Sequence, residues 1–257
     1  KAKKLVNWDV VLKTAISDLE VDQREVNSQL YYINYPIENS DKFITIATTR
    51  PETMLGDTAI AVNPKDDRFK DLVGKFVIIP LANRKIKIIS DDYADPEQGT
   101  GAVKITPAHD FNDYDVGIRN KLEVINIFTP DGKINDNAPD PYKGLDRFAA
   151  RKLILEHLEE GKFLEKIEKL INKVPYGDRS NSIIEPYLTE QWFVDAKTLA
   201  VKAKEVVNNG KTKFFPENWS KTYFQWMNNI EPWCISRQLW WGHQIPAWYG
   251  PDGKIFV

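Results

Sequence analysis

The chain has little cysteine and no long apolar run. Cys234 is the single cysteine among 257 residues, which excludes an internal disulfide and makes a reducing, cytoplasmic location the expectation. No apolar stretch approaches the length that spans a membrane, and no signal-peptide pattern opens the chain. Positive charge is not in excess, since 35 Lys and Arg face 37 Asp and Glu. This balance argues against a protein whose main task is to coat nucleic acid, although it permits a local basic patch.

Internal repeats and low-complexity tracts are also absent. From about residue 29 to residue 174, β-branched runs alternate with turns such as Pro130-Asp-Gly132, which predicts a barrel-like β core. One segment predicts a helix that covers this core, with Asp146 as its cap and Gly161 as its end. The apolar face of that helix consists of Leu145, Phe148, Leu155 and Leu158. The expected strands include residues 59–62, 76–79, 86–89 and 124–128.

One polar cluster lies between Gly99 and Tyr114. A short strand over 102–106 ends at Pro107, and Asp110 then starts a helix on which Asp113 lies one turn later. Together with Lys104 and Thr106, these carboxylates suit a small ligand that carries an ammonium and a hydroxyl group. The structural alternative is that each aspartate is only a helix cap and Thr-Pro only a turn.

A second polar cluster follows the strand-like run 43–47 and reads TTRPETMLGD, residues 48–57. Pro51 occupies the first position of a short helical turn and Gly56 its end. Arg50 and Thr53 therefore flank one turn. By itself this pattern is common in β proteins.

The two clusters, TTRPETMLGDTAIAVNP and GTGAVKITPAHDFNDYDVG, closely resemble the editing (connective peptide) domain inserted in class I valyl-tRNA synthetases, with the isoleucyl and leucyl enzymes as more distant relatives. The resemblance covers nearly the whole chain, from LVNWD near the start to WCISRQLWWGHQIPAWY near the end. One position departs from the family pattern. Gln98 stands before Gly-Thr-Gly where the family often has an aromatic residue.

The resemblance implies an α+β fold with a β-barrel-like editing domain and peripheral helices. We expect a connecting ribbon over 1–27, the editing domain over 28–190 and a helical, aromatic segment over 191–257 that returns to the catalytic domain. Neither a HIGH-like nor a KMSKS-like signature is present, so the chain is expected to be part of a larger enzyme and not to activate an amino acid. The expected partners are the acceptor end of valine tRNA and the parent catalytic domain, with no cofactor, metal or membrane.

The implied reaction is hydrolysis of threonine mistakenly esterified to valine tRNA. A hydrophobic pocket discriminates poorly between valine and the nearly isosteric threonine, so a second site must bind the hydroxyl group. By resemblance, Asp113 anchors the α-ammonium, while Lys104, Thr106 and Asp110 bind the threonine hydroxyl. An activated ester held beside an oriented water needs no covalent nucleophile. The predicted catalytic residues are Asp113, Lys104 and Asp110, and the predicted substrate-binding residues are Arg50, Thr53, Thr49, Thr106 and His109.

Three alternatives remain open at this stage. His109 is either a general base or a structural residue beside a helix cap. With Asp110 and Asp113 it could instead form a metal site of a phosphohydrolase, for which His157 and His243 are the only further histidines. A noncatalytic tRNA-binding module would bind tRNA without deacylating it.

The end of the chain is rich in aromatic residues. Seven of the eight tryptophans lie at or after Trp192, and four of them recur every seven residues. Pro232 interrupts that heptad, so an aromatic packing surface is favoured over a coiled coil. The lysines of this region either contact tRNA phosphates or form a solvated helix face. They are Lys197, Lys202, Lys204, Lys211 and Lys213.

Overall fold

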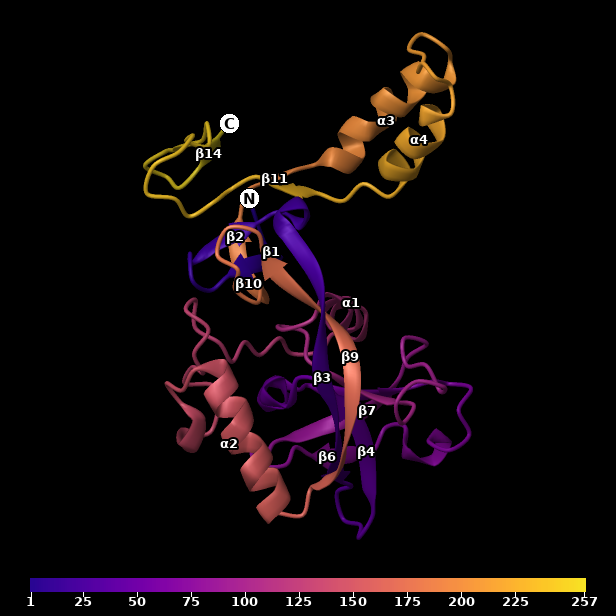
Figure 1. The fold of residues 1–257 in the computed structure, drawn as a ribbon, viewed down its shortest axis with the longest axis vertical. Helices are drawn as coiled ribbons and strands as arrows, with labels where there is room; N and C mark the ends of the chain where they lie inside the picture. Colours follow the sequence, from indigo (N-terminus) through magenta and orange to yellow (C-terminus); the bar gives the residue numbers. More distant parts are fainter.

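The computed structural model describes residues 1–257 and consists mainly of strands, with four α-helices. Figure 1 shows a lower body and an upper arm joined by a long two-stranded ribbon. The ribbon pairs β3 (Val21–Pro36) with β9 (Leu164–Gly177) in antiparallel fashion. β4 (Phe43–Thr48) pairs with the C-terminal part of β3, residues 31–36, and completes a three-stranded sheet.

A second sheet of four strands, in the order β6-β7-β5-β8, packs in the lower body. Its strands are β5 (Ala59–Val62), β6 (Phe76–Ile78), β7 (Lys85–Ser90) and β8 (Ala102–Ile105). Every residue of β5 is buried, as expected for a central strand covered on both faces. The main core of 23 buried residues draws on both sheets and on α2.

The helices of the lower body begin at their predicted caps. α1 (Phe111–Asn120) starts after Asp110, whose side chain accepts the backbone N–H groups of Asn112 and Asp113. α2 (Arg147–Glu160) starts after Asp146 and ends at Gly161, as predicted. Its predicted apolar face is wrong at Phe148, which is exposed, because the buried stripe of the helix runs through Ala150, Ile154 and Leu158; Leu145 and Leu155 are partly buried against the core. The short helices are η1 (Asp18–Glu20), η2 (Pro51–Gly56), η3 (Lys70–Leu72) and η4 (Asp140–Tyr142).

The α+β class is confirmed, but the strands form separate sheets and do not close into a barrel. The strand predicted over 124–128 is wrong, since only Phe128 makes an isolated bridge. Side chains replace ladder partners there: Ile127 N donates to the His109 ring, and Phe128 N donates to Asn126 Oδ1. The segment also lies against Gly56, where an added Cβ would come 2.9 Å from Ile125 O.

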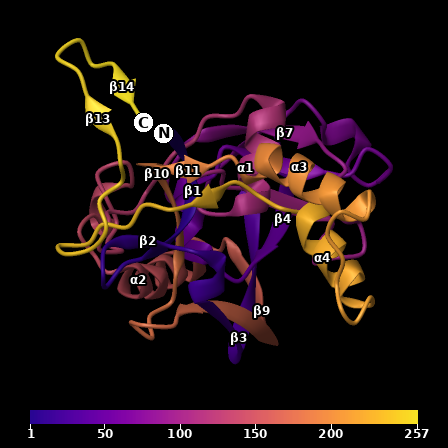
Figure 2. The ribbon, with the colours of Figure 1, turned by 90° about the horizontal axis from the view of Figure 1, so that it is seen from above.

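The upper arm begins with a small sheet in the order β10-β1-β2. It is formed by β1 (Ala2–Asp9), β2 (Thr14–Ile16) and β10 (Glu185–Gln191). Beyond it, β11 (Phe193–Val194) pairs with β12 (Trp233–Cys234), and the helices α3 (Ala196–Asn208) and α4 (Trp219–Asn228) form a hairpin. Figure 2 shows the last hairpin, β13 (Trp248–Tyr249) with β14 (Ile255–Phe256), projecting away from the rest of the chain.

The predicted segment boundaries stay predictions, and the first one, after residue 27, lies inside β3. The heptad tryptophans do not share one helix, because Trp219 and Trp226 lie on α4 whereas Trp233 lies in β12. None of the helices has both the length and the apolar character needed to cross a membrane.

Candidate functional site

The two polar motifs meet in the lower body, where η2 lies beside β8. Lys104, on β8, directs its ammonium toward three oxygen atoms: Thr53 Oγ1 at 2.9 Å, Asp57 Oδ1 at 3.2 Å and Thr106 Oγ1 at 2.5 Å. Thr106 Oγ1 in turn donates to Asp57 Oδ1 at 2.6 Å. All four residues are buried, so the predicted Lys104, Thr53 and Thr106 belong to one buried cluster.

Asp57 is the centre of this cluster, and it is absent from the predicted site. Its second carboxylate oxygen accepts the Tyr35 hydroxyl at 2.8 Å, and the residue is fully buried. Burial raises the pKa of Asp57, while the Lys104 charge and the hydrogen bonds from Thr106 and Tyr35 oppose that rise. The sequence signal for a residue such as Asp57 was Lys104, since a lysine on a buried strand requires a buried anion as its partner. Asp57 precedes β5, where Ile60 pairs with Lys104.

Asp113 lies next to this cluster on the first turn of α1. Its Oδ2 accepts the backbone N–H of Thr106 at 2.8 Å. Burial is the largest cause that raises its pKa to about 7, the Lys104 charge opposes the rise, and the Asp110 charge adds to it. Asp110 itself is exposed, and it uses Oδ1 to cap α1. The two aspartates therefore differ in surroundings although they share one helical turn.

Arg50 belongs to a second, separate group of charges. Its guanidinium contacts the carboxylates of Glu185 and Glu52 and donates to His109 O at 3.2 Å. Two arginines of α2 complete the group: Arg151 binds Glu52 at 2.7 Å, and Arg147 lies 3.2 Å from Glu185.

Both carboxylates of this second group are almost fully buried, so each charge depends on its arginine partners. Although burial favours the neutral form of Glu52, the hydrogen bonds and charge of Arg151, followed by the Arg50 charge, lower its pKa. For Arg50, burial acts against the charge, but Glu185 and Glu52 raise its pKa. These shifts favour the ionised forms of Glu52 and Arg50.

His109 is held as a neutral ring. Its Nε2 accepts the Ile127 N–H at 3.0 Å, which leaves the hydrogen on Nδ1. Its ring packs edge-on against the Phe128 ring, with 4.6 Å between the ring centroids. Burial, followed by the charges of Arg50 and Lys104, lowers its pKa well below the ordinary value. Nδ1 is buried without a hydrogen-bond partner. In this arrangement the ring has no free basic nitrogen.

A cleft of about 570 Å³ is lined by 20 residues, which come from the lower body, the ribbon and the sheet of the upper arm. Four predicted site residues are among them: Thr49, Arg50, His109 and Asp110. The other four, Thr53, Lys104, Thr106 and Asp113, are buried and do not line this cleft. The structure thus divides the predicted site into an open part and a buried part. The volume of the cleft falls in the range of small-ligand sites.

The metal-site alternative lacks its ligands. No group of three or more His, Cys, Asp or Glu side chains is placed to hold a metal ion. His157 shares a hydrogen bond of 2.8 Å with the Tyr142 hydroxyl, and His243 is exposed in the C-terminal segment.

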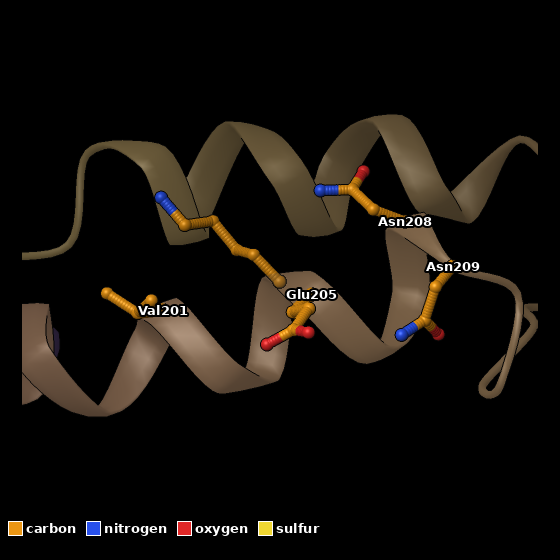
Figure 3. Close-up of a pocket in the computed structure, with 5 residues that line it drawn as sticks. Val201, Glu205, Asn208 and Asn209 are labelled. Atoms are coloured by element: carbon orange, nitrogen blue, oxygen red, sulfur yellow. The ribbon is translucent and has the colours of Figure 1, made fainter.

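A second hollow of about 450 Å³ lies on α3, far from both motifs in the sequence. Figure 3 shows its lining side chains on this helix beside α4. They are Val201, Lys204, Glu205, Asn208 and Asn209. Of the lysines considered above, Lys197 pairs with Glu231 at 2.9 Å and Lys204 binds Asn228. Because the hollow contains one apolar residue and no predicted site residue, we do not assign a site to it.

Comparisons with known proteins extend over the whole chain. The family model described as "tRNA synthetases class I (I, L, M and V)" matches residues 1–257. The chain is 79% identical over 257 residues to a valine–tRNA ligase of Pelagibacter ubique, and 57% identical over 279 aligned residues to that of Bradyrhizobium diazoefficiens. It spans 29% of the length of each of these relatives.

A comparison with solved structures matches part of this chain to another protein. That protein is the LeuRS of Agrobacterium radiobacter in a ternary complex with tRNA and LeuAMS. The two chains are 19% identical with a TM-score of 0.45, over 67% of this chain and 30% of the other.

Proposed function

The chain belongs to the class I tRNA synthetases, and from this premise we propose that it hydrolyses a mischarged tRNA ester. The proposed substrate is threonine esterified to valine tRNA, and the chain acts as the editing domain of a valine–tRNA ligase. Its proposed partners are the acceptor end of the tRNA and the catalytic domain of the same enzyme. A cytoplasmic location accompanies this proposal.

The observation that carries the proposal is the buried cluster of Asp57, Lys104 and Thr106. A buried set of hydrogen-bonding groups discriminates strongly between a ligand with a hydroxyl group and one with a methyl group, because the methyl group leaves polar atoms unpaired. Lys104 already directs its ammonium to three oxygens. A substrate hydroxyl therefore binds here by exchange with a threonine hydroxyl of the cluster, which valine cannot do.

Asp113 supplies the anchor for the substrate ammonium. Near neutral pH its carboxyl group titrates, since its pKa is about 7, and an ammonium nearby favours the ionised form. A charge-assisted hydrogen bond in a nearly dry site is stronger than one in water. Binding of the α-ammonium thus fixes the ester relative to the buried cluster.

The water that attacks the ester is assigned to the open side of the site. Asp110 lines the cleft and uses only Oδ1 for its cap hydrogen bonds, so Oδ2 can accept a hydrogen bond from water. His109 is not assigned this role, because Nε2 already accepts the Ile127 N–H. The ester is activated, so positioning of water can supply much of the rate.

The C-terminal arm supports the proposed catalytic-domain partner. Trp226 is 67% exposed, and Trp240 and Trp241 are more exposed still. Large apolar side chains gathered on one segment are typical of a protein interaction surface.

The test is deacylation of threonyl-tRNA specific for valine, compared with valyl- and isoleucyl-charged tRNA. Asp113→Ala should abolish hydrolysis without unfolding the chain, whereas Asp115→Ala, an exposed aspartate on the same helix, should keep it. Thr106→Val should reduce the preference for threonyl over valyl ester about tenfold, the value of one or two hydrogen bonds. Near-normal deacylation by folded Asp113→Ala would refute the assignment. Binding of tRNA without any deacylation would favour the noncatalytic module.

A further inference from the structure

Phe148, the second residue of α2, lies on the wall of the cleft, and it is 41% exposed. Two guanidinium groups lie over its ring, that of Arg147 at 4.7 Å and that of Arg151 at 5.3 Å from the centroid. Aromatic rings with neighbouring arginines are surfaces on which unpaired nucleobases stack.

The surroundings of this ring are fixed before any ligand binds. Arg151 donates two hydrogen bonds to Glu52, at 2.7 and 2.8 Å. Arg147 donates to Ile183 O at 2.9 Å and lies beside Glu185. Groups that are already held in place lose little conformational freedom on binding, which favours affinity.

The ribbon contributes polar groups to the same cleft. Gln23 and Ser28 of β3 and Asn172 of β9 can donate and accept hydrogen bonds along a base edge or a ribose. Lys173 also lines the cleft, is exposed and forms none of the ion pairs found in the chain. An unpaired ammonium in the same cleft as an aromatic platform suits a phosphate of the same strand.

We propose that Phe148 is a stacking platform for an unpaired nucleobase at the end of a single-stranded RNA lying in this cleft, with Lys173 contacting its backbone. The proposal rests on the proposed function for the identity of the strand. Asp110, to which the attacking water is assigned, lines the same cleft, so a base on Phe148 lies in the same hollow as that carboxylate.

The experiment measures binding of a short single-stranded RNA to the 257-residue chain. The RNA carries 2-aminopurine at its last or next-to-last position, because stacking on an aromatic ring quenches that fluorophore. Phe148→Ala should weaken binding about tenfold and abolish the quenching, while Phe148→Trp should retain both. Phe76→Ala is the matched control, since Phe76 is 39% exposed and has the Lys85 ammonium 5.2 Å from its ring but lies outside the cleft.

Unchanged affinity and quenching in Phe148→Ala would overturn the platform, as would an absence of RNA binding by the unmodified chain. Equal affinity for adenosine monophosphate and for the RNA would overturn the assignment to a strand end. Deacylation is measured separately on the unmodified chain. If the unmodified chain stacks the RNA base but does not deacylate the ester, the proposed function is refuted and the platform stays in place.

Discussion

The molecule contains two buried groups of charges that differ in composition and reach. The first, the cluster around Asp57 and Lys104, joins one ammonium and one carboxylate to neutral hydroxyl groups. The second joins three arginines to Glu52 and Glu185. Hydroxyl groups can exchange partners with a ligand, whereas guanidinium–carboxylate pairs hold one geometry.

Their positions differ as well. The first group lies within the lower body, between η2 and β8. The second group connects η2 and α2 with Glu185 on β10, which belongs to the sheet of the upper arm. Under the proposed function the first group would select the ligand, whereas the contacts of the second group connect the cleft with the arm.

The largest expected effect comes from a substitution that breaks the first group. Lys104→Met leaves the Asp57 carboxylate buried without its cation, which should lower the free energy of unfolding by about 3 to 5 kcal/mol. Urea denaturation measures this change. Adding Asp57→Asn should restore part of the loss by removing the orphan charge. Lys85→Met, which breaks an exposed pair with Glu38, should change stability little; an equal loss in both lysine variants would contradict the special role of the first group.

The second prediction uses the titration of Asp113 beside the first group. Its pKa is about 7 in the folded chain, above the ordinary value of 3.8, so the folded state binds more protons between these two pH values. Stability therefore falls as pH rises, by roughly 2 to 3 kcal/mol between pH 5 and pH 7.

Asp113→Asn should remove this part of the pH dependence. The measurement is chemical denaturation of both proteins at several pH values, and the difference between them isolates Asp113 from other titrating groups. Parallel stability curves for the two proteins would show that Asp113 is not buried in this way.

The third prediction breaks the second group. Glu185→Gln removes the carboxylate shared by Arg50 and Arg147 and should reduce stability by about 2 kcal/mol. It should also raise KM for the tRNA ester more than it lowers kcat, because Arg50 loses its fixed position in the cleft. Glu190→Gln on the same strand removes an exposed pair with Lys1 and should leave both properties unchanged. A fall confined to kcat would place Glu185 in the chemistry instead.

Local patterns in the sequence predicted much of the fold. Asp146 and Gly161 bound α2 as expected, because a helix cap depends on a few neighbouring residues. Strand β5 was predicted at its full length from its β-branched and small apolar residues. The strand over 124–128 failed for two reasons. Asn126 accepts the Phe128 N–H in a local turn, and His109 accepts the Ile127 N–H in a tertiary contact that an apolar run does not reveal.

The site shows the same division. The two motifs predicted Lys104, Thr106 and Thr53, which the structure brings into one hydrogen-bonded cluster. Asp57 was missed because its partner lies 47 residues away and only the pairing of β5 with β8 brings the two together. Glu185 was missed for the same reason, since its contact with Arg50 crosses 135 residues. Assigning either one requires the fold.

The smallest expected effect concerns the side of the cleft that neither charged group reaches. The arginines of the second group are neutralised by carboxylates, so few cations in the cleft remain to contact phosphates. Binding of tRNA by this chain should therefore be weak, salt-sensitive and largely independent of tRNA identity. Lys173→Ala should lower the slope of log affinity against log salt by about one. Lys169→Ala, on the same strand but outside the cleft, is the control. The measurement is binding of tRNA to both variants at several salt concentrations. Equal slopes for the two variants would place the RNA on the outer surface of the ribbon. Tight, salt-insensitive, cognate-only binding would contradict a cleft that depends on the rest of the enzyme for delivery of its substrate.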